Sequence, residues 1–445
     1  MHDALVILRS MKSVLPRRVL AAVLLAAALP AARAQLGLPS LPRLPSVPSL
    51  TSPVAAPLQR PLPAASDLMR ARRQRVADLL QQRRQFVEAD PAGEPAVRGE
   101  LLLTSPAQPL LDAARAEGFT IVRERRLDAL DLTVVTLRAP EGWDTGRGLR
   151  RLRELDPQAA IDFNHLYLES GTAGPRGAAG PGVATVAPAP PGPMRVGLVD
   201  GGVETDHPLL RGAAIHAWGC GGRKVGSAHG TAVASLLVGR GPRFRSAAPD
   251  AVLYAADVYC DDPVGGSIEA VAAALAWLIG ERVPVVNISL VGPANRTLEQ
   301  VVRRATARGV VLVAAVGNDG PAAPPLYPAA YPEVVAVTAV DARGDVLPEA
   351  CRGPHVAFAA PGAEMAAAGL GRPPYAVMRG TSFASPLVAG LLAAQLREPD
   401  ATAAGLAVAA LSRQADDAGA PGRDVVFGHG LVGRALRTDP ALVLR

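Results

Sequence analysis

The chain has 445 residues, which is long enough for two or three domains and a large hydrophobic core. Hydrophobic residues make up 49% of the chain and aromatic residues only 4%. The net charge of +6 comes from residues 1–66, which carry 7 basic side chains and 1 acidic one, whereas residues 194–445 carry 22 of each. The composition excludes a collagenous, wholly disordered or small disulfide-stapled protein, and the balanced charge argues against nucleic acid as a partner.

The first 34 residues have the pattern of an export signal. Basic residues precede an apolar stretch at 19–32, which ends in the cleavage motif Ala32-Arg33-Ala34. We therefore expect a signal peptide over 1–34 and a secreted protein, periplasmic or extracellular, with no stable membrane insertion after cleavage. An uncleaved membrane anchor is the alternative, but it needs about 18 or more apolar residues.

Two segments of low complexity divide the rest of the chain. Residues 35–66 repeat Leu-Pro and Ser-Pro, and residues 171–193 are rich in Gly, Ala and Pro, so both are predicted to be linkers. Residues 67–86 have helical periodicity with many arginines. They form either a basic amphipathic surface or a solvated helix that leads into the next domain.

Between the linkers, residues 67–170 are predicted to hold a small α+β domain. After the leading helix, hydrophobic periodicity indicates the order strand, helix, strand, strand, helix, strand, at 99–105, 109–118, 119–126, 132–139, 146–155 and 159–168. This is the βαββαβ order of ferredoxin-like domains.

Residues 194–445 show a second pattern, in which apolar strands alternate with helices. Helices are expected at Ile268–Ile279 and Leu298–Arg308, and strands at 194–200, 251–259, 283–290, 309–317 and 334–340. Strands that are apolar on both faces indicate a doubly wound α/β fold with a mostly parallel sheet. In such sheets, active residues gather at the carboxyl ends of the strands.

Four polar residues at strand ends or helix starts could carry chemistry. Asp200 closes the strand in VGLVDGGV, His229 opens HGTAVASLLVG, Asn318 follows the strand in VLVAAVGNDGP, and Ser382 lies in RGTSFASPLVAG. Each alone is an ordinary turn or cap residue. Together they match what a serine nucleophile needs: an imidazole base, a carboxylate that orients it and donors for an oxyanion.

The segments VGLVDGGV, HGTAVAS, NISLVGP, VAAVGNDG and GTSFASP, in this order across residues 194 to about 436, resemble the motifs of the subtilisin-like serine proteases, the subtilase family or peptidase family S8. The chain order Asp, His, Ser is the order of that class. The resemblance implies that Asp200 orients His229, that His229 is general base and then acid, and that Ser382 attacks the scissile carbonyl. It also implies an oxyanion hole formed by the Asn318 side chain and the backbone N–H of Ser382.

The same resemblance assigns substrate contacts to Ser289, Leu290, Val291 and Val316. Val291 stands where the family usually has glycine, and Val316 where a smaller alanine is common. Both add bulk to the pocket for the residue that precedes the scissile bond. We therefore expect small or medium apolar residues there, and equal cleavage of Phe and Ala substrates would contradict this.

No cofactor is expected, and no metal site is predicted. Family members often bind calcium through the loop after the histidine helix, but residues 239–248 contain no Asp, Asn or Glu. Structural calcium elsewhere stays open, although the acidic pair Asp261 and Asp262 is more typical of a solvated turn. Among the three cysteines, Cys220 and Cys260 are the preferred disulfide pair, and three independent buried thiols are an equal alternative.

The resemblance implies an exported serine endopeptidase, made as a self-processed zymogen and monomeric, whose partners are protein or peptide substrates and its own propeptide. Residues 67–170 match such a propeptide in element order only, so an unrelated accessory domain is the alternative. Maturation is expected to cut between Tyr167 and Met194. A non-catalytic binding protein on the same scaffold, and a dedicated processor instead of a broad protease, are the rival functions.

Overall fold

The computed structural model describes residues 65–173 and 192–444, all of which belong to the unit Pro61–Arg445. The expected signal peptide at 1–34, nearly all of the first linker and most of the second lie outside the described residues. Among the described helices, none has both the length and the hydrophobicity that crossing a membrane requires.

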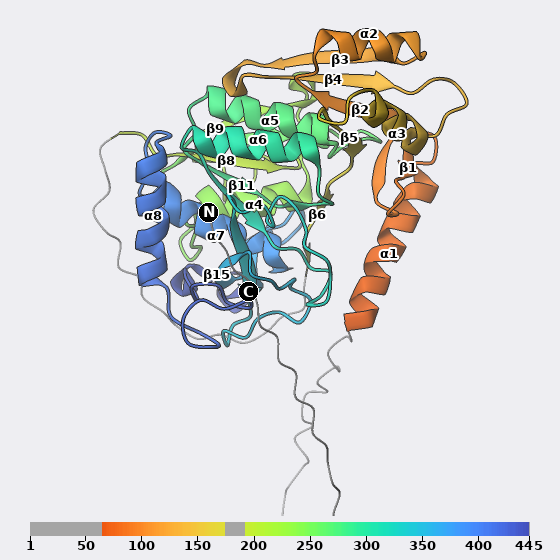
Figure 1. The fold of residues 1–445 in the computed structure, drawn as a ribbon. Helices are drawn as coiled ribbons and strands as arrows, with labels where there is room; N and C mark the ends of the chain where they lie inside the picture. Colours follow the sequence, from red (N-terminus) through yellow and green to blue (C-terminus); the bar gives the residue numbers. More distant parts are fainter. Residues whose placement is uncertain (1–64, 174–191, 445) are drawn as a thin grey trace, which may run out of the picture. The chain divides into compact units, whose positions relative to one another are not determined.

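The N-terminal part, coloured orange to yellow in Figure 1, contains the predicted βαββαβ order. Its elements are β2 (Pro95–Thr104), α2 (Gln108–Ala116), β3 (Thr120–Leu127), β4 (Leu132–Arg138), α3 (Thr145–Leu155) and β5 (Ala160–His165). The sheet is antiparallel, with β2 between β4 and β5 and with β3 beside β4. The ferredoxin-like prediction is therefore confirmed, with helix α1 (Ala65–Gln82) and the short strand β1 (Val87–Ala89) added before it.

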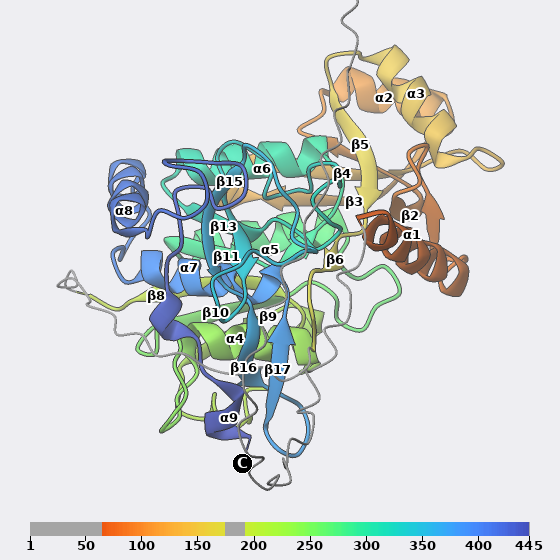
Figure 2. The ribbon, with the colours of Figure 1, turned by 90° about the horizontal axis from the view of Figure 1, so that it is seen from below.

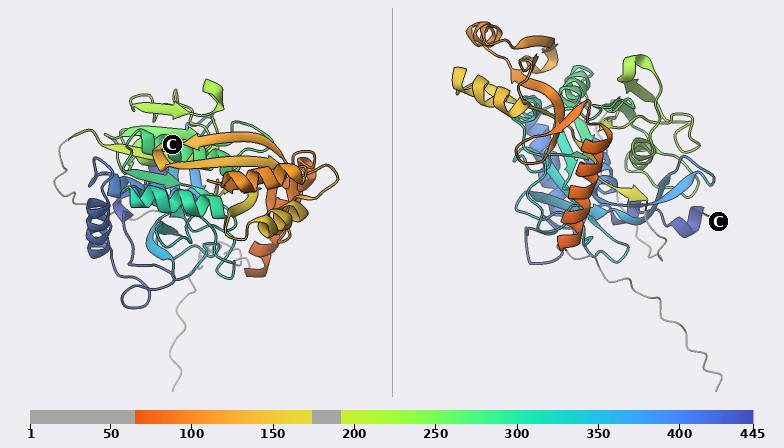
Figure 3. Two further views of the ribbon diagram at one scale, coloured as in Figure 1. Left: turned by 45° about the horizontal axis from the view of Figure 1, so that its top comes forward. Right: turned by 90° about the vertical axis from the view of Figure 1, so that its right-hand side faces the viewer.

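Both faces of this antiparallel sheet are covered. Leu101 and Leu103 of β2 pack with the helices α2 and α3, whereas Leu102, on the opposite face, packs with the helices of the following α/β part. Alternating side chains of a strand point to opposite faces, so the continuous apolar run in GELLLT requires two partners. The second partner is supplied by α5 (Ile268–Gly280) and α6 (Arg296–Ala307), and Figure 3 shows the orange strands lying over these green helices.

Residues 194–444 form the predicted doubly wound α/β fold. Seven strands lie in the order β15-β14-β13-β11-β8-β10-β9, and every neighbouring pair is parallel. Their bounds are β8 (Arg195–Asp200), β9 (Ile215–Trp218), β10 (Val252–Asp257), β11 (Val285–Ile288), β13 (Val311–Ala315), β14 (Val335–Val340) and β15 (Val356–Pro361). The edge strands β9 and β15 were not predicted, because β9 is half exposed and carries a histidine, and β15 is rich in alanine and ends in proline.

Helices cover both faces of the parallel sheet (Figures 1 and 2). Helices α5 and α6 share one hydrophobic cluster with the N-terminal sheet, while α4 (Ala228–Val238) and α7 (Ser385–Ala393) pack in the cluster of the other face. Nearly all residues of α4 and α7 are buried, which fits their composition of small and apolar residues. The hairpin of β16 (Ala363–Ala368) and β17 (Tyr375–Arg379) and the helices α8 (Ala401–Gln414) and α9 (Pro440–Val443) complete this part.

Strand β5 also caps the two helices against which the N-terminal sheet packs. The Asp162 carboxylate accepts a hydrogen bond of 2.9 Å from the backbone N–H of Arg296, the first residue of α6. The Asn164 side-chain oxygen accepts one of 3.2 Å from the N–H of Glu269 in the first turn of α5. Because the first N–H groups of a helix have no partner inside the helix, these contacts couple the N-terminal sheet to the orientation of α5 and α6.

Candidate active site

The residues singled out in the sequence meet at the carboxyl edge of the parallel sheet. Asp200 is the last residue of β8, Ser289 directly follows β11, and Asn318 lies three residues after β13. Helix α4 brings His229 to this edge, and the short helix η3 (Thr381–Phe383), just before α7, brings Ser382. This is the edge at which doubly wound folds hold their active residues.

Asp200 and His229 form a buried hydrogen-bonded pair. The Nδ1 atom of His229 lies 2.8 Å and 3.1 Å from the two carboxylate oxygens of Asp200. The Asp200 side chain is fully buried and also accepts the backbone N–H of Gly201 at 2.6 Å. The close approach of α4 to the loop after β8 depends on Gly230, because a Cβ there would collide with the carbonyl oxygen of Gly201.

The Asp200 carboxylate governs the protonation of His229. Burial lowers the pKa of the His229 imidazole, but the charge of Asp200 and its hydrogen bond outweigh burial and raise that pKa above its ordinary value of 6.5. The carboxylate therefore favours the imidazolium form, and its hydrogen bond to Nδ1 leaves Nε2 as the free ring nitrogen.

Ser382 contacts the carbonyl group of Ser170, a residue of the N-terminal part of the chain. Its Oγ–H donates to the Ser170 carbonyl oxygen, and its backbone N–H donates to the same oxygen at 3.1 Å. Within the described residues Nε2 of His229 has no hydrogen-bond partner, while the His229 ring packs against Phe383 with ring centroids 5.4 Å apart. The structure thus joins Asp200 with His229 and Ser382 with Ser170, without a hydrogen bond from His229 to Ser382.

Asn318 also contacts Ser170. Its side-chain Nδ2 donates to Ser170 Oγ at 2.8 Å, and its side-chain oxygen accepts the backbone N–H of Thr381 at 3.0 Å. The amide expected to face an oxyanion therefore binds the side chain of the residue whose carbonyl faces Ser382. The two groups that the resemblance implies for an oxyanion hole converge on one residue.

Residues 167–173, named here the cleft segment, cross this edge of the sheet as an added strand. Strand β6 (Leu168–Glu169) pairs antiparallel with β12 (Leu290–Val291), so that Glu169 lies opposite Leu290 and Leu168 opposite Val291. Beyond Ser170, strand β7 (Thr172–Ala173) pairs antiparallel with β17. Pairing on both sides of Ser170 resembles the strand addition by which extended peptides bind to sheet edges.

The four predicted substrate contacts have three different placements. Leu290 and Val291 pair through their backbones with the cleft segment. Ser289 instead supports Ser382, because its hydroxyl donates to the Ser382 carbonyl at 3.1 Å. Val316 is fully buried in the cluster of α5 and α6. The size preference derived from Val291 and Val316 stays a prediction.

Sequence reasoning missed the residues of the cleft segment that make these contacts, namely Leu168, Glu169 and Ser170. The predicted strand at 159–168 ended where the pairing partner changes from β2 to β12, and a two-residue strand leaves no periodicity to detect. The available signal was the small pair Ser170-Gly171, which lies at the boundary between the predicted strand and the Gly-, Ala- and Pro-rich linker.

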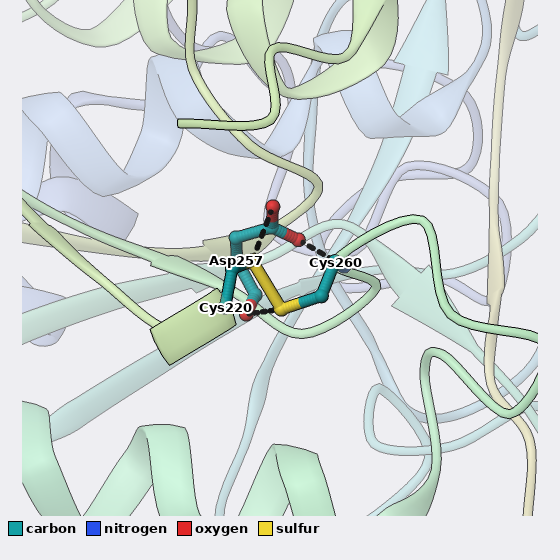
Figure 4. A group of neighbouring side chains, drawn as sticks. All are labelled: Cys220, Asp257 and Cys260. Atoms are coloured by element: carbon teal, nitrogen blue, oxygen red, sulfur yellow. Dashed lines mark hydrogen bonds between the residues drawn. A yellow bond between two sulfur atoms is a disulfide. The ribbon is translucent and has the colours of Figure 1, made fainter. Parts of the chain in front are cut away.

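Cys220 and Cys260 form a disulfide with an S–S distance of 2.22 Å, and Cys351 is free and buried. Figure 4 shows Asp257, the last residue of β10, beside this disulfide. Asp257 Oδ1 accepts the backbone N–H groups of Tyr259 and Cys260, each at 2.9 Å. Burial raises the pKa of Asp257 and outweighs the two backbone hydrogen bonds, which lower it, and the charge of Asp200 adds a smaller increase.

Two groups of metal-type donors occur among the described residues, but neither is suited to a resident ion. One consists of Cys220, Asp257 and Cys260, whose sulfurs are bonded to each other and cannot ligate as thiolates. The other consists of Glu169, Asp200 and His229, in which Asp200 already binds the histidine. The expectation of no metal and no cofactor remains a prediction.

Glu169 places a third acidic group beside the Asp200–His229 pair. Glu169 is exposed as a residue, but a carboxylate oxygen lies within 4.8 Å of donor atoms of Asp200 and His229. Burial of the carboxyl raises its pKa to about 7, helped by Asp200 and Asp257 and opposed by His229. The cleft segment therefore carries a carboxyl that holds a proton more tightly in the cleft than in water.

We predict that Asp200→Asn lowers the pKa of His229, because it removes the charge that offsets burial. The measurement is an NMR titration of the histidine imidazoles in the full chain, in a Ser382→Ala background. Asp257→Asn is the matched control and should have a smaller effect, since Asp257 makes no hydrogen bond to His229 in the described structure. A His229 pKa that does not change with Asp200→Asn would contradict the assignment.

We also predict that Glu169→Gln stabilises the full chain above pH 7 relative to its parent. A carboxyl with a raised pKa binds more protons in the folded than in the unfolded state, so its contribution to stability falls as pH rises from about 4.5 to about 7. Unfolding in urea at pH 4 and pH 8, in a Ser382→Ala background, measures this. Glu141→Gln, in the loop after β4, is the control, and equal effects of Glu169→Gln at both pH values would disprove the prediction.

A model of the subtilase family matches residues 193–430 of the chain. The chain is 32% identical over 254 residues to the minor extracellular protease Epr of Bacillus subtilis (strain 168), covering 56% of this chain and 39% of that protein. It is 37% identical over 205 residues to Subtilisin BL of Lederbergia lenta, covering 45% of this chain and 75% of that protein. The chain thus spans less than half of the length of Epr.

A solved structure shows the same fold. Fervidolysin from Fervidobacterium pennivorans, described as a keratinolytic enzyme related to subtilisin, superimposes with a TM-score of 0.64 at 22% identity and covers 79% of this chain and 62% of its own. The superposition with fervidolysin therefore covers a larger share of the chain than the match to the family model, which is limited to residues 193–430. Since the family model matches more than half of the residues, the chain belongs to the subtilase family of serine-type endopeptidases.

Proposed function

We propose that the chain is an exported serine endopeptidase with Asp200, His229 and Ser382 as its triad, made as a zymogen that cuts itself between Ser170 and Gly171. One observation carries this proposal: the Ser170 carbonyl lies against both the hydroxyl and the backbone N–H of Ser382. That arrangement also favours catalysis over the rival function of a non-catalytic scaffold, because a carbonyl is held where a nucleophile needs it.

The contacts support a defined sequence of steps. Ser382 Oγ attacks the carbonyl carbon of Ser170 while its proton passes to Nε2 of His229, the nitrogen without a partner. Asp200, bound to Nδ1, stabilises the imidazolium that forms. The oxyanion accepts the Ser382 N–H, and Asn318 Nδ2 reaches it by turning from the neighbouring Ser170 Oγ.

The intermediate then loses the new chain end. His229 gives its proton to the amine of Gly171, the bond between Ser170 and Gly171 breaks, and Ser170 remains as an ester on Ser382. Water, activated by His229, hydrolyses that ester and returns the hydroxyl. Strand β7, which pairs with β17, keeps Gly171 in place while the bond breaks.

The N-terminal part is proposed as the propeptide of this protease. Its sheet buries Leu102 against α5 and α6, and its β5 side chains cap both helices. Arg123 of β3 binds the carboxylates of Glu269 at 2.7 Å and of Glu100 at 2.8 Å, each of which is nearly buried. These contacts would assist folding of the α/β part and keep the cleft segment in its cleft.

The export proposal rests on the signal pattern at 1–34 and on the similarity to a relative named as extracellular. The wider substrates are proposed to be proteins or peptides, as in the rest of the family. We also propose that the protein is a monomer and works without a cofactor.

Self-cleavage predicts a new N-terminus that reads Gly171-Thr172-Ala173 in the wild-type protein. Ser382→Ala is expected to stay uncut, because no other hydroxyl contacts the Ser170 carbonyl in the described structure. Intact mass and N-terminal sequencing after export measure both outcomes. Ser412→Ala, on the distant helix α8, is the matched control and should be cut like wild type.

Identical trimming of wild type and Ser382→Ala would show that another protease cuts the chain. A self-generated N-terminus elsewhere than Gly171 would keep the proteolytic activity but overturn the position of the bond.

A further inference from the structure

Helix α1 brings two arginines to the loop that carries Asn318. Arg72 Nε lies 2.7 Å from one carboxylate oxygen of Asp319, and Arg75 Nη2 donates to the other oxygen at 3.0 Å. Asp319 directly follows Asn318 in the chain, and only 4% of it is exposed. The arginine-rich helix therefore makes contact directly beside the proposed oxyanion group.

Among the described residues, these two arginines are the only cations in contact with Asp319. Arg72 also binds Glu94 through two hydrogen bonds of 2.7 Å, so its guanidinium lies between two carboxylates. Both arginines precede the bond between Ser170 and Gly171 in the chain. Loss of the N-terminal fragment would therefore leave the Asp319 carboxylate without a cation.

Hydrophobic contacts hold α1 beside the start of the cleft segment. Val76 of this helix is 5% exposed, and Leu80 packs against the cluster that contains Val87 and Leu166. Leu166 directly precedes the cleft segment. The helix that carries the arginines and the segment that carries the reacting carbonyl are thus anchored together.

The α/β part already fixes the backbone of the loop around Asn318. The N–H of Gly317 donates to Thr381 Oγ1 at 3.1 Å, and the N–H of Gly320 donates to the Glu349 carbonyl at 2.8 Å. These bonds do not involve α1. What the arginines add to the loop is therefore positive charge more than shape.

The charge of Asp319 matters because the proposed reaction creates another negative charge close by. Asn318 Nδ2 is proposed to donate to the oxyanion that forms on Ser170. An unpaired carboxylate on the next residue would raise the energy of that oxyanion, and water screens this repulsion weakly at a nearly buried site. With the arginines bound, their charges cancel those of Asp319 and Glu94, whereas a chain without them keeps two negative charges here.

The same charges control the protonation of Asp319. Burial raises the pKa of its carboxyl, the two arginines lower that pKa, and Glu94 raises it. Cys351 adds no charge at neutral pH, because burial raises the pKa of its thiol to about 12. Without the arginines, the Asp319 carboxyl would bind its proton more tightly, and its charge would appear only as the pH rises.

We infer that Arg72 and Arg75 are positioning residues for the first cut. They neutralise Asp319, so that Asn318 donates to the oxyanion without a competing charge beside it. This inference rests on the proposed function and deepens it, because it assigns part of the support for catalysis to a helix that the mature protease lacks. Self-cleavage therefore depends on α1, whereas the mature chain cuts other substrates without it.

The test follows the first cut in chains that fold before they can react. The full chain is refolded from urea at pH 5, where the His229 imidazole is protonated because Asp200 raises its pKa, and folding is checked by circular dichroism. A jump to pH 8 starts the reaction. Electrophoresis and N-terminal sequencing then give the initial rate at which chains beginning with Gly171 appear.

Arg72→Gln combined with Arg75→Gln should lower this rate about tenfold, which is a part of the 10²–10³-fold that a whole oxyanion donor contributes. Adding Asp319→Asn should restore the rate to within about threefold of the parent, because a neutral side chain needs no cation. Arg70→Gln combined with Arg73→Gln, at exposed positions of the same helix, removes the same charge and is the matched control. This control should cut itself like the parent.

The pH profile separates this role from a purely structural one. The ratio of the parent rate to the rate of the double variant should rise from pH 6 to pH 8, because only the unpaired Asp319 becomes charged as the pH rises. Titration of His229 affects both chains and cancels in the ratio. Arg75→Gln alone, at a side chain that is 59% exposed, leaves the buried contacts of α1 intact and should slow the cut about threefold.

A double variant that cuts itself as fast as the parent would overturn the inference and leave the protease intact. A slowed variant that Asp319→Asn does not restore, or whose ratio to the parent is the same at every pH, would show that the arginines only hold the helix, and would overturn it as well. Absence of a Gly171 N-terminus in the parent at pH 8 would instead overturn the proposed self-cleavage on which the inference rests.

Discussion

The contact between the Ser170 carbonyl and Ser382 is the constraint on which the arrangement of the whole chain depends. The Ser170 carbonyl oxygen accepts two hydrogen bonds from Ser382, and the segment that carries it is held on both sides. Strand β6 pairs with β12 before Ser170, and strand β7 pairs with β17 after it. Holding a reacting group in this way replaces an encounter in solution by a fixed geometry, which is a large part of what enzymes supply.

The position of the N-terminal sheet follows from the same constraint. Strand β5 leads directly into the cleft segment, so the sheet must lie where β5 can both cap α5 and α6 and bring β6 to its partner β12. The apolar residues of β2 allow this position, because those on one face pack against α2 and α3 and those on the other face pack against α5 and α6. Packing, helix capping and the active site are thus coupled through a single strand.

Much of the fold and site could be predicted from the sequence, because long apolar strands and helices leave clear periodicities. Strands such as β8 and β13 were located, and motifs identified Asp200, His229, Asn318 and Ser382 as residues that meet at one edge. The cleft segment could not be predicted, since two-residue strands acquire their form from partners far away in the chain. The direction of the Ser289 hydroxyl likewise depends on tertiary packing, as does the core position of Val316.

The position of the disulfide could likewise not be derived from the sequence alone. Three cysteines permit three pairs, and the pairing of Cys220 with Cys260 follows from loops that meet beside the end of β10. Nothing in their spacing of 40 residues determines that meeting. Hydrophobic periodicity in the sequence locates helices and strands. Contacts between loops depend on how the strands assemble into the sheet, so the sequence pattern does not predict them.

The most direct measurement of the central claim is a time course of fluorophosphonate labelling, with intact and cut chains separated by electrophoresis and the labelled residue identified by mass spectrometry. Because the cleft segment contacts the Ser382 hydroxyl, we expect the intact chain to resist labelling. Ser382 should become labelled only in chains that begin at Gly171 and have lost the N-terminal fragment. Equal labelling of intact and cut chains would show that the cleft segment does not block Ser382.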